Sequence, residues 1–385
     1  MSEETVKAVI ASRIFAPEPA AASFRLRALA REIVARGGSV RVLTTTVPPS
    51  VANLPGEEGI DVRRAPVLRD SAGYVRGYAQ YMSFDIPLFF RLLLCPRPDV
   101  VICEPPPTTG FFTRIATAIR RVPYVYYAAD IWSDAAESSA PAPIVKTLRL
   151  VEAWAMRGAA EVIAVSDAVA DRVRALGARD ITVAPNGIDT DIFTPTTSQT
   201  HPRPGERYFI YAGTASEWQG AEVFAEAMEL VHREAPDVKL YYLGQGSSAG
   251  RISEIAGLLP AGVVTQLGRV GQSEAASWQA HAKAALVSIK PGLGYDFAMP
   301  TKVYSALATG TPVIYAGPGP LREEIVAHDL GEVVDHDPSA VAAVMLRALQ
   351  SPEADSERLR AWAVDHHSLV ATGRAAYTAL ERALR

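Results

Sequence analysis

Lys302 is the residue whose type and position point most directly to chemistry. It follows Pro300 and Thr301 and opens a segment, KVYSALATG, whose pattern predicts a short helix that ends at Gly310. The chain has only six lysines, and two of them, Lys290 and Lys302, bracket one loop. Because a helix N-terminus carries partial positive charge and free amide groups, a lysine there is unfavourable unless an anion binds. We therefore expect a diphosphate at this position; the alternative is an ordinary solvated lysine.

Asp130 is the carboxylate best placed for acid–base or hydrogen-bonding work. It lies in the segment AADIWSD, directly after the strand-like run VPYVYY. The pattern therefore puts it at the carboxyl end of a strand, where α/β sheets bind their ligands. A carboxylate there can hold sugar hydroxyls or take a proton from an acceptor group. The alternative is an acid that caps a helix or pairs with an arginine, and Trp132, two residues later, is more often a packing residue than a ligand.

Two further loops offer small residues and neutral hydrogen-bonding groups. Both follow strand-like runs and precede helical ones, in the segments YAGTASEWQG and LGQGSS. Small residues let the backbone approach a ligand closely, and hydroxyl or amide side chains bind phosphates or sugars without charge. A single GxG pattern is weak evidence by itself. The residues concerned are Thr214, Ser216 and Gln219 in the first loop and Gly244 and Gly246 in the second.

The first loop of the chain, SRIFAPEPAAASFR at 12–25, contains no glycine. It therefore lacks the Gly-rich turn of dinucleotide-binding enzymes, and the NAD-binding fingerprint is absent. The loop leads into a helix that we expect to begin near Ser23. Free amide groups at that helix start can bind an anion or a hydroxyl-rich ligand; alternatively, Ser23 is a plain N-cap.

Composition and charge exclude several other classes of protein. The 385 residues carry a net charge of −4, which argues against a dedicated nucleic-acid-binding protein. Cys95 and Cys103 are too few for a disulfide scaffold or a zinc site, and no histidine pair has metal-ligand spacing, so we expect no metal. The most apolar stretch, 84–95, is too short to span a membrane. The N-terminus lacks the basic start of a secretory signal, and together these features predict a soluble, cytoplasmic protein.

An aromatic run lies in the first half of the chain. Its spacing is most typical of a buried helix face. The alternatives are an apolar acceptor site and a patch that contacts a membrane surface, so peripheral membrane contact stays open. The run consists of Tyr74, Tyr78, Tyr81, Phe84, Phe89 and Phe90.

These residues need a scaffold that brings strand ends together. Short β-branched runs alternate with longer amphipathic segments, which predicts parallel sheets covered by helices. The alternation stops in the proline- and threonine-rich segment 194–206 and then restarts. We therefore expect two doubly wound α/β domains, 1–195 and 196–367, that face each other across a cleft. A last helix, about 368–385, follows with no strand after it.

Longer motifs carry a family resemblance over nearly the whole length. They are FAPEPAAASFRLRALAREIVARGGSVRVLTT, ADIWSD, EVIAVSDAVADRVRALGA and APNGIDTDIFTP in the first domain, and YAGTASEWQG, LGRVGQSE and KPGLGYDFAMPTKVYSALATGTPVI in the second. With these motifs the chain resembles the retaining, nucleotide-sugar-dependent glycosyltransferases of family 4, which have the GT-B fold. The resemblance implies transfer of a sugar, with retention, to a hydroxyl or amine in polysaccharide or natural-product biosynthesis.

The resemblance also implies a division of labour between the domains. The second domain would bind the nucleotide-sugar donor, the first would bind the acceptor, and the terminal helix would pack back on the first domain. In retaining enzymes of this type the departing phosphate is thought to take the acceptor proton. Neither a protein base nor a metal or other cofactor is then needed. The oligomeric state is left open.

The predicted site combines the residues above with positions that match the family motifs. The catalytic residues are Lys302, Asp130 and Arg269, with Arg269 as a second positive charge. The donor-binding residues are Gly213, Thr214, Ser216, Gln219, Gly244, Gly246, Val270, Lys290, Pro300, Thr301, Tyr304 and Ser305. The acceptor-binding residues are Pro19, Ala22, Ser23 and Trp132.

The chain departs from the family pattern at several of these positions. Ser305 stands where members usually carry a glutamate that contacts the donor ribose, and Asp296 is the acid nearest to the place of a second one. Thr214 and Gln219 stand in place of a customary arginine and lysine. These losses favour a rival interpretation, a non-catalytic GT-B protein that activates or scaffolds another transferase. A sugar-nucleotide epimerase has a similar two-domain shape but no sequence feature in its favour.

Overall fold

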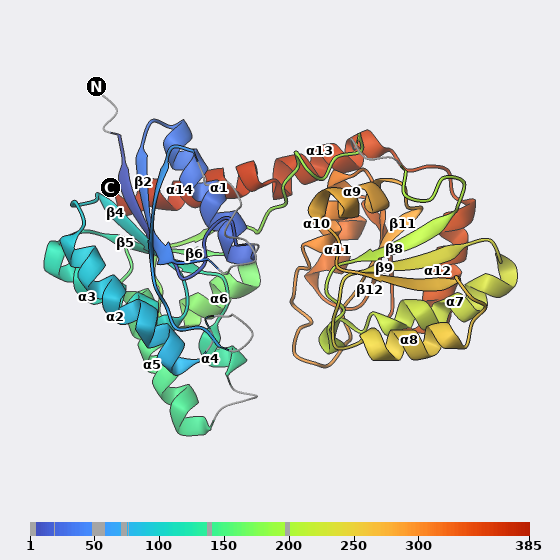
Figure 1. Ribbon diagram of the computed structural model, residues 1–385, viewed down its shortest axis with the longest axis horizontal. Coiled ribbons are helices and arrows are strands. Elements are labelled where there is room, and N and C mark those ends of the chain that lie inside the picture. The colour runs from blue at the N-terminus through green and yellow to red at the C-terminus, as the bar shows by residue number, and fades with distance from the viewer. Residues whose placement is uncertain are drawn as a thin grey trace. The chain divides into compact units, whose positions relative to one another are not determined.

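The computed structural model describes residues 5–18, 20–47, 58–70, 75, 77–136, 141–196 and 201–385. The chain forms two compact units (Figure 1). Unit 1 consists of Met1–Gly187 and Leu369–Arg385, and unit 2 consists of Ile188–Ser368. Each unit contains one parallel sheet with a hydrophobic core on both of its faces, as the alternating pattern predicts.

Unit 1 is built on a seven-stranded sheet with the strand order β3-β2-β1-β4-β5-β6-β7. Its central strands are rich in valine, isoleucine and tyrosine and are buried on both faces, as strands between two helix layers must be. The strands are β1 Lys7–Ala11, β2 Ser39–Thr45, β3 Ile60–Ala65, β4 Val100–Cys103, β5 Tyr124–Ala128, β6 Glu161–Ala164 and β7 Ile181–Val183.

Helices cover both faces of this sheet. α1 and α14 pack on one face, where Leu26, Leu29 and Leu380 join the core, and α2, α3 and α5 pack on the other. Gly373 lets α14 lie close to α1, because a Cβ built there would lie 2.6 Å from the carbonyl oxygen of Ala28 (Figure 1). The helices are α1 Ala21–Ala35, α2 Tyr78–Leu94, α3 Pro107–Arg120, α4 Trp132–Ala135, α5 Ala142–Arg157, α6 Asp167–Ala175 and α14 Leu369–Ala383.

Unit 2 repeats the plan with a six-stranded sheet in the order β10-β9-β8-β11-β12-β13. The strands are β8 Tyr208–Ala212, β9 Lys239–Leu243, β10 Val264–Gly268, β11 Ala284–Ser288, β12 Val313–Ala316 and β13 Gly331–Val334. A 3-10 turn, η2 Glu217–Gln219, follows β8. The helices are α7 Glu222–Glu234, α8 Ala249–Gly257, α9 Gln272–Ala280, α10 Lys302–Ala308, α11 Pro320–Ala327, α12 Pro338–Gln350 and α13 Ser356–His367.

Both sheets reverse their winding direction beside the first strand. β1 lies between β2 and β4, and β8 lies between β9 and β11. Such a reversal opens a crevice outside the carboxyl ends of the central strands, where doubly wound sheets bind ligands. The expectation of two doubly wound α/β units is confirmed. No helix in the described ranges is both long and apolar enough to cross a bilayer.

The boundary between the units differs from the one expected near residue 195. The structure divides between Gly187 and Ile188, because the segment that follows packs on unit 2. Phe193 is buried in the core of unit 2, and Arg360 donates hydrogen bonds of 2.9 and 3.0 Å to the carbonyl groups of Phe193 and Thr190. The residues directly after the crossing are therefore part of unit 2 and do not form a free linker.

Candidate functional site

Helix α10 places Lys302 beside the carboxyl end of β8. Its Nζ donates hydrogen bonds to the Tyr211 hydroxyl at 2.5 Å and to the Thr214 carbonyl at 3.0 Å. Nζ also lies 4.0 Å from the centre of the Tyr211 ring. Just before the helix, Pro300 is buried and Thr301 is exposed. Lys302 thus reaches from the start of α10 to the loop after β8 and presents its charge there.

The charge of Lys302 has no acidic counterpart among the described residues. Both of its hydrogen-bond acceptors are neutral, and burial lowers the pKa of Lys302 to about 7. A partly buried ammonium group with only neutral partners gains from an anion, because the anion supplies the counter-charge and favours the protonated form. This geometry supports the diphosphate expected from the sequence, which stays a prediction.

The glycines of the two loops bring backbones together. Gly213 has φ +134°, and a Cβ there would lie 3.2 Å from Lys302 Cε. A Cβ on Gly244 would lie 2.1 Å from the Gly213 carbonyl oxygen, and one on Gly246 would lie 2.0 Å from that of Ala215. The amides of Gly213 and Ala215 donate hydrogen bonds of 2.7 and 3.1 Å to carbonyl groups of the second loop. A small hollow lies between the loops, lined by Gly213, Ala215 and Gly244.

The predicted neutral ligands of the first loop have different placements. Ser216 and Gln219 form a capping box, and the Ser216 amide donates to Gln219 Oε1 at 3.2 Å. The Tyr211 hydroxyl lies 3.2 Å from the same oxygen, and Gln219 is buried. The side chain of Thr214 is exposed, while its carbonyl holds Lys302. Gln219 therefore positions the loop, and the hydroxyl of Thr214 is open to solvent.

Ser305 and Tyr304 point into the core of unit 2. The buried Ser305 hydroxyl donates to the Lys302 carbonyl at 3.0 Å and accepts from Gln279 Nε2 at 3.1 Å. The ring of Tyr304 is buried and stacks on His367 with 3.5 Å between ring centres. Because the Tyr304 ring is almost fully buried, donor binding by this residue stays a prediction that the packing does not support. Both residues hold α10 in place.

Arg269 and Lys290 are the other cations that follow strands of unit 2. Arg269, directly after β10, is exposed and makes no hydrogen bond or ion pair with a described residue. Lys290, just after β11, is exposed, and its Nζ lies 3.9 Å from Glu222 Oε1. Val270 packs partly buried against the core. Arg269 is therefore available to a phosphate, whereas Glu222 partly neutralises the charge of Lys290.

Asp130 lies in the turn after β5 of unit 1. Asp130 is exposed as a residue, and its carboxylate makes no hydrogen bond or ion pair with any residue of the described ranges, so it neither caps a helix nor pairs directly with an arginine there. Desolvation by the surrounding protein raises the pKa of Asp130; Arg25 opposes that rise and Glu104 adds to it. An unpaired carboxylate at a strand end can accept hydrogen bonds from a hydroxyl-rich ligand.

A buried hydrogen-bond network lies at the ends of β1 and β4, and the sequence patterns did not predict it. Glu104, directly after β4, accepts hydrogen bonds from Ser12 Oγ at 2.6 Å and from Arg25 Nη2 at 2.8 Å. Ser12 and Glu104 are 92 positions apart and meet only because β1 and β4 are neighbours. The one sequence signal was an acid directly after the strand VVIC. The network neutralises Arg25 and fixes the first turns of α1 on the sheet.

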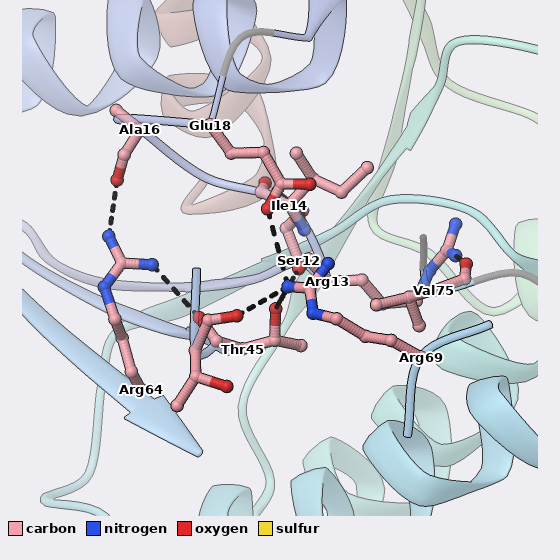
Figure 2. A network of polar contacts seen from close by, with 10 residues as sticks. Ser12, Arg13, Ile14, Ala16, Glu18, Thr45, Arg64, Arg69 and Val75 are labelled. Atoms are coloured by element: carbon pink, nitrogen blue, oxygen red, sulfur yellow. Dashed lines mark hydrogen bonds and ion pairs between the residues drawn. The ribbon is translucent and has the colours of Figure 1, made fainter. Parts of the chain in front are cut away.

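Figure 2 shows how the loop after β1 is held. Thr45 Oγ donates to the Arg13 carbonyl at 2.8 Å, and Arg64 donates to the carbonyl groups of Ala16 at 2.5 Å and Thr45 at 3.0 Å. Arg13 in turn donates to the Val75 carbonyl at 2.9 Å. Side chains from β2 and β3 thus fix the backbone that leads into α1.

The start of α1 corrects one expectation. The helix begins at Ala21, its N-cap Ala20 makes no side-chain hydrogen bond, and Ser23 lies within the first turn. Ser23 is therefore not a plain N-cap. It is 2% exposed, and its hydroxyl has no hydrogen-bond partner among the described residues, which is unusual for a buried polar group. Ala22 is half-buried beside it, and Pro19 lies outside the described residues.

Trp132, the first residue of α4, belongs to a cluster of rings and one cation. Its ring meets that of Tyr81 edge to face with 5.5 Å between centres. The Arg13 guanidinium lies 4.6 Å from the Tyr81 ring and 5.7 Å from the Trp132 ring. The Trp132 amide donates to buried Glu152 at 2.8 Å, which caps α4. The cluster gives Trp132 a packing role beside Asp130, and a ligand contact stays a prediction.

Within each unit, therefore, most of the predicted residues follow strands at the carboxyl edge of the sheet. No group of three or more histidine, cysteine or acidic side chains that could hold a metal ion occurs in the described parts of the chain.

Both units match known families. Residues 21–187 match the family model of the glycosyl transferase 4-like domain, and 206–351 match that of glycosyl transferases group 1. The chain is similar to a D-inositol 3-phosphate glycosyltransferase of Paenarthrobacter aurescens, with 32% identity over 198 residues. That alignment covers 47% of this chain and 47% of the relative, so the chain spans about half the length of the curated relatives it matches.

Solved structures share the fold of the whole chain. Sucrose-phosphate synthase from Thermosynechococcus elongatus superposes with a TM-score of 0.71 at 16% identity, over 97% of this chain and 98% of that one. HepE of Anabaena in complex with UDP-glucose superposes with a TM-score of 0.71 at 18% identity, over 98% of this chain and 100% of that one. At such identities the likeness concerns the fold alone.

Proposed function

Because the chain belongs to the glycosyltransferases with a glycosyl transferase 4-like domain and a group 1 domain, we propose that it moves a sugar from a nucleoside diphosphate donor to a hydroxyl or amine acceptor with retention. The observation that carries this proposal is Lys302, a partly buried cation at a strand end with only neutral partners. Negative charge grows on the leaving diphosphate as the sugar bond breaks. A fixed cation there stabilises the transition state more than the bound donor.

We assign the donor to unit 2. Lys302 and Arg269 would contact the diphosphate, and the exposed Thr214 hydroxyl would bind a phosphate or sugar oxygen. The bond between the anomeric carbon and the diphosphate oxygen breaks, and the acceptor oxygen or nitrogen forms its bond on the same face. The acceptor proton passes to the departing diphosphate oxygen. No described side chain then has to act as a base.

We assign the acceptor to unit 1. Asp130 would accept hydrogen bonds from acceptor hydroxyls. The uncapped first turn of α1 and the unpartnered Ser23 hydroxyl would donate to acceptor oxygens. The name of the Paenarthrobacter relative makes D-inositol 3-phosphate the first acceptor to test. The free thiols Cys95 and Cys103 fit a reducing compartment, and we propose the cytoplasm.

The rival function is a non-catalytic partner that activates or scaffolds another transferase. Ser305 supports it, because its hydroxyl is bound inward to Gln279 and leaves the donor ribose without the acid that the family resemblance leads one to expect. The missing counter-charge of Lys302 and the unpaired carboxylate of Asp130 favour the enzyme, because a non-catalytic protein gains nothing from a partly buried cation without an acidic partner.

Titration calorimetry with UDP, GDP, ADP and dTDP tests the donor assignment. UDP comes first, because HepE was solved with UDP-glucose. We expect one nucleotide to bind, and Lys302→Ala to weaken it about 10- to 100-fold, the value of a charge-assisted contact. The matched control is Lys283→Ala, whose ammonium group binds the Ser351 carbonyl at an exposed position. If no nucleotide binds at millimolar concentration, the scaffold function replaces the enzyme.

Turnover of Asp130→Asn tests the acceptor assignment. Hydrolysis of nucleotide sugars without acceptor first identifies the donor. With that donor, we expect Asp130→Asn to lower transfer to the acceptor while UDP binding to unit 2 is unchanged, because the carboxylate is a stronger hydrogen-bond acceptor than the amide. Transfer at the wild-type rate would show that Asp130 is not part of the acceptor site.

A further inference from the structure

We propose that unit 1 carries a docking surface for an anionic lipid bilayer, formed by the outer faces of α2, α3 and α5. α3 packs against both other helices, and all three cover the same face of the sheet (Figure 1). Their inward faces fill the core with residues such as Leu88 and Met156. Their outward faces have two properties that would be unnecessary on a surface that contacts only water.

The first property is exposed apolar area at the spacing of one helix face. Ile86, Phe90 and Leu94 follow one another at intervals of four along α2, and all three are exposed, Leu94 by 84%. α5 exposes Leu150 and Trp154 at the same interval. Isolated exposed apolar residues are ordinary on a soluble protein, but a continuous apolar patch marks a binding surface.

Ring contacts join the helix faces into one patch. Phe90 meets Phe89 within α2 at 5.3 Å between ring centres, and Phe89 meets Phe112 of α3 at 6.3 Å. Phe112 meets Phe111 at 5.5 Å, and Phe111 meets Trp154 of α5 at 5.1 Å. The rings thus run without a break from α2 to α5. We call Phe89, Phe90, Phe111, Phe112 and Trp154 the aromatic patch.

The second property is charge, and it identifies the partner as anionic. The acids of the three helices, Asp85 and Glu152, are both fully buried. The outward faces therefore carry no exposed carboxylate, although the whole chain has a net charge of −4. The basic residues of the same helices are Arg91, Arg114, Arg120, Lys146, Arg149 and Arg157.

Most of this positive charge is not neutralised. Arg120 and Arg157 donate to backbone carbonyl groups, which carry no net charge. Lys146 is exposed and makes no hydrogen bond or ion pair with a described residue. Arg149 differs, because it lies 3.5 Å from the Asp134 carboxylate.

The Arg114 guanidinium lies 4.1 Å from the centre of the Trp154 ring, and Lys146 lies eight positions before Trp154 on α5. Cations beside partly exposed aromatic rings match an anionic headgroup layer above acyl chains. A second copy of this chain fits less well, because a symmetric contact would place these like charges opposite each other. Among the interpretations of the aromatic run left open by the sequence, the surface patch is therefore the one that Phe89 and Phe90 support. Tyr74, from the same run, lies outside the described residues.

Co-sedimentation of the full chain with lipid vesicles tests the proposal. We expect binding to vesicles of equal parts phosphatidylcholine and phosphatidylglycerol at low salt, and weaker binding as salt rises. Vesicles of phosphatidylcholine alone should bind little. Leu94→Glu and Lys146→Glu should each lower the partition coefficient at least about tenfold, since each adds repulsion from the anionic surface and the first also loses apolar contact.

Two variants control for exposure and charge. Leu258 in unit 2 is 86% exposed against 84% for Leu94, so Leu258→Glu repeats the chemistry outside the patch. Lys7→Glu repeats the charge reversal at the exposed start of β1. Both should bind vesicles as the wild type does. Equal thermal unfolding of all four variants would show that the fold is intact.

Three outcomes would overturn the proposal. They are no binding to the mixed vesicles at low salt, equal binding by the patch and control variants, and a dimer in solution that Leu94→Glu dissociates, which would assign the patch to a second copy. Vesicle binding requires no turnover and no nucleotide. Failure here therefore leaves the proposed transferase untouched, and failure of nucleotide binding leaves this surface untouched.

Discussion

If the proposed contact between Lys302 and the diphosphate is made, nucleotide binding depends on pH. Burial lowers the pKa of its ammonium group to about 7, and a diphosphate bound beside it would raise that pKa again. At any pH at which Lys302 of the nucleotide-free protein is neutral, nucleotide binding then takes up a proton. We expect affinity for UDP to fall by up to about tenfold per pH unit between about pH 7 and pH 9. Calorimetry across that range measures the slope.

Lys302→Arg is the control for this slope. A guanidinium group keeps its charge throughout the range, so the affinity of this variant, whatever its absolute value, should hardly change with pH. A wild-type affinity that is equally flat would mean that the diphosphate does not contact Lys302.

Candidate site residues could be predicted from the sequence only where they lie next to the end of a predicted strand or helix. Lys302 and Asp130 are recognisable because a strand end or helix start lies within a few positions of each. Ser12, Arg25 and Glu104 are not, because their meeting depends on β1 and β4 being neighbours in the sheet. Local pattern finds a residue at an edge, whereas a contact between distant segments requires the topology.

At the scale of elements, the loops after β8 and β9 depend on glycine. Gly244 has φ +135°, and a Cβ there would lie 2.1 Å from the Gly213 carbonyl oxygen. Gly244→Ala should therefore force the loops apart and lower the free energy of unfolding by about 3 kcal/mol, from strain and overpacking together. Urea unfolding gives the value, and UDP affinity should fall with it.

Gly250 provides the matched substitution. It lies within α8, and a Cβ there meets nothing within 4 Å. Gly250→Ala should be neutral or stabilise by up to about 1 kcal/mol, because alanine leaves the unfolded chain fewer conformations than glycine and fits the helical backbone. Similar losses in both variants would refute a special role of the loop glycine.

Element boundaries show where sequence patterns reach their limit. The pattern placed the start of α1 near Ser23, a frequent N-cap residue, but the extended backbone of Ala20 begins the helix and Ser23 is buried. The proline-rich segment suggested a boundary near residue 195, but Phe193 and Arg360 bind the preceding segment to unit 2. In both cases packing on a neighbour, which no local pattern records, decided the boundary.

At the scale of the whole chain, unit 2 is an insertion within unit 1. The chain leaves unit 1 after Gly187 and returns at Leu369. The two crossings run side by side: the Ile188 amide donates to the His367 carbonyl at 2.7 Å, and Thr372 Oγ donates to the Pro185 carbonyl at 2.7 Å. Unit 1 is therefore completed only by α14, the last helix of the chain, and the two ends of unit 2 lie next to each other.

This order predicts that the units differ in their independence. Residues 188–368 have a closed core and adjacent ends, so they should fold alone and bind UDP as the full chain does, if the donor site lies within unit 2.

Residues 1–187 lack α14 and would expose the face of α1 that includes Leu26 and Leu29, so they should aggregate. Joining Gly187 to 369–385 by a short glycine linker should restore a soluble unit, because the ends to be joined are neighbours. Circular dichroism, light scattering and calorimetry check all three; a stable, monomeric 1–187 fragment would show that α14 is dispensable, and a folded 188–368 fragment that fails to bind UDP would place part of the donor site in unit 1.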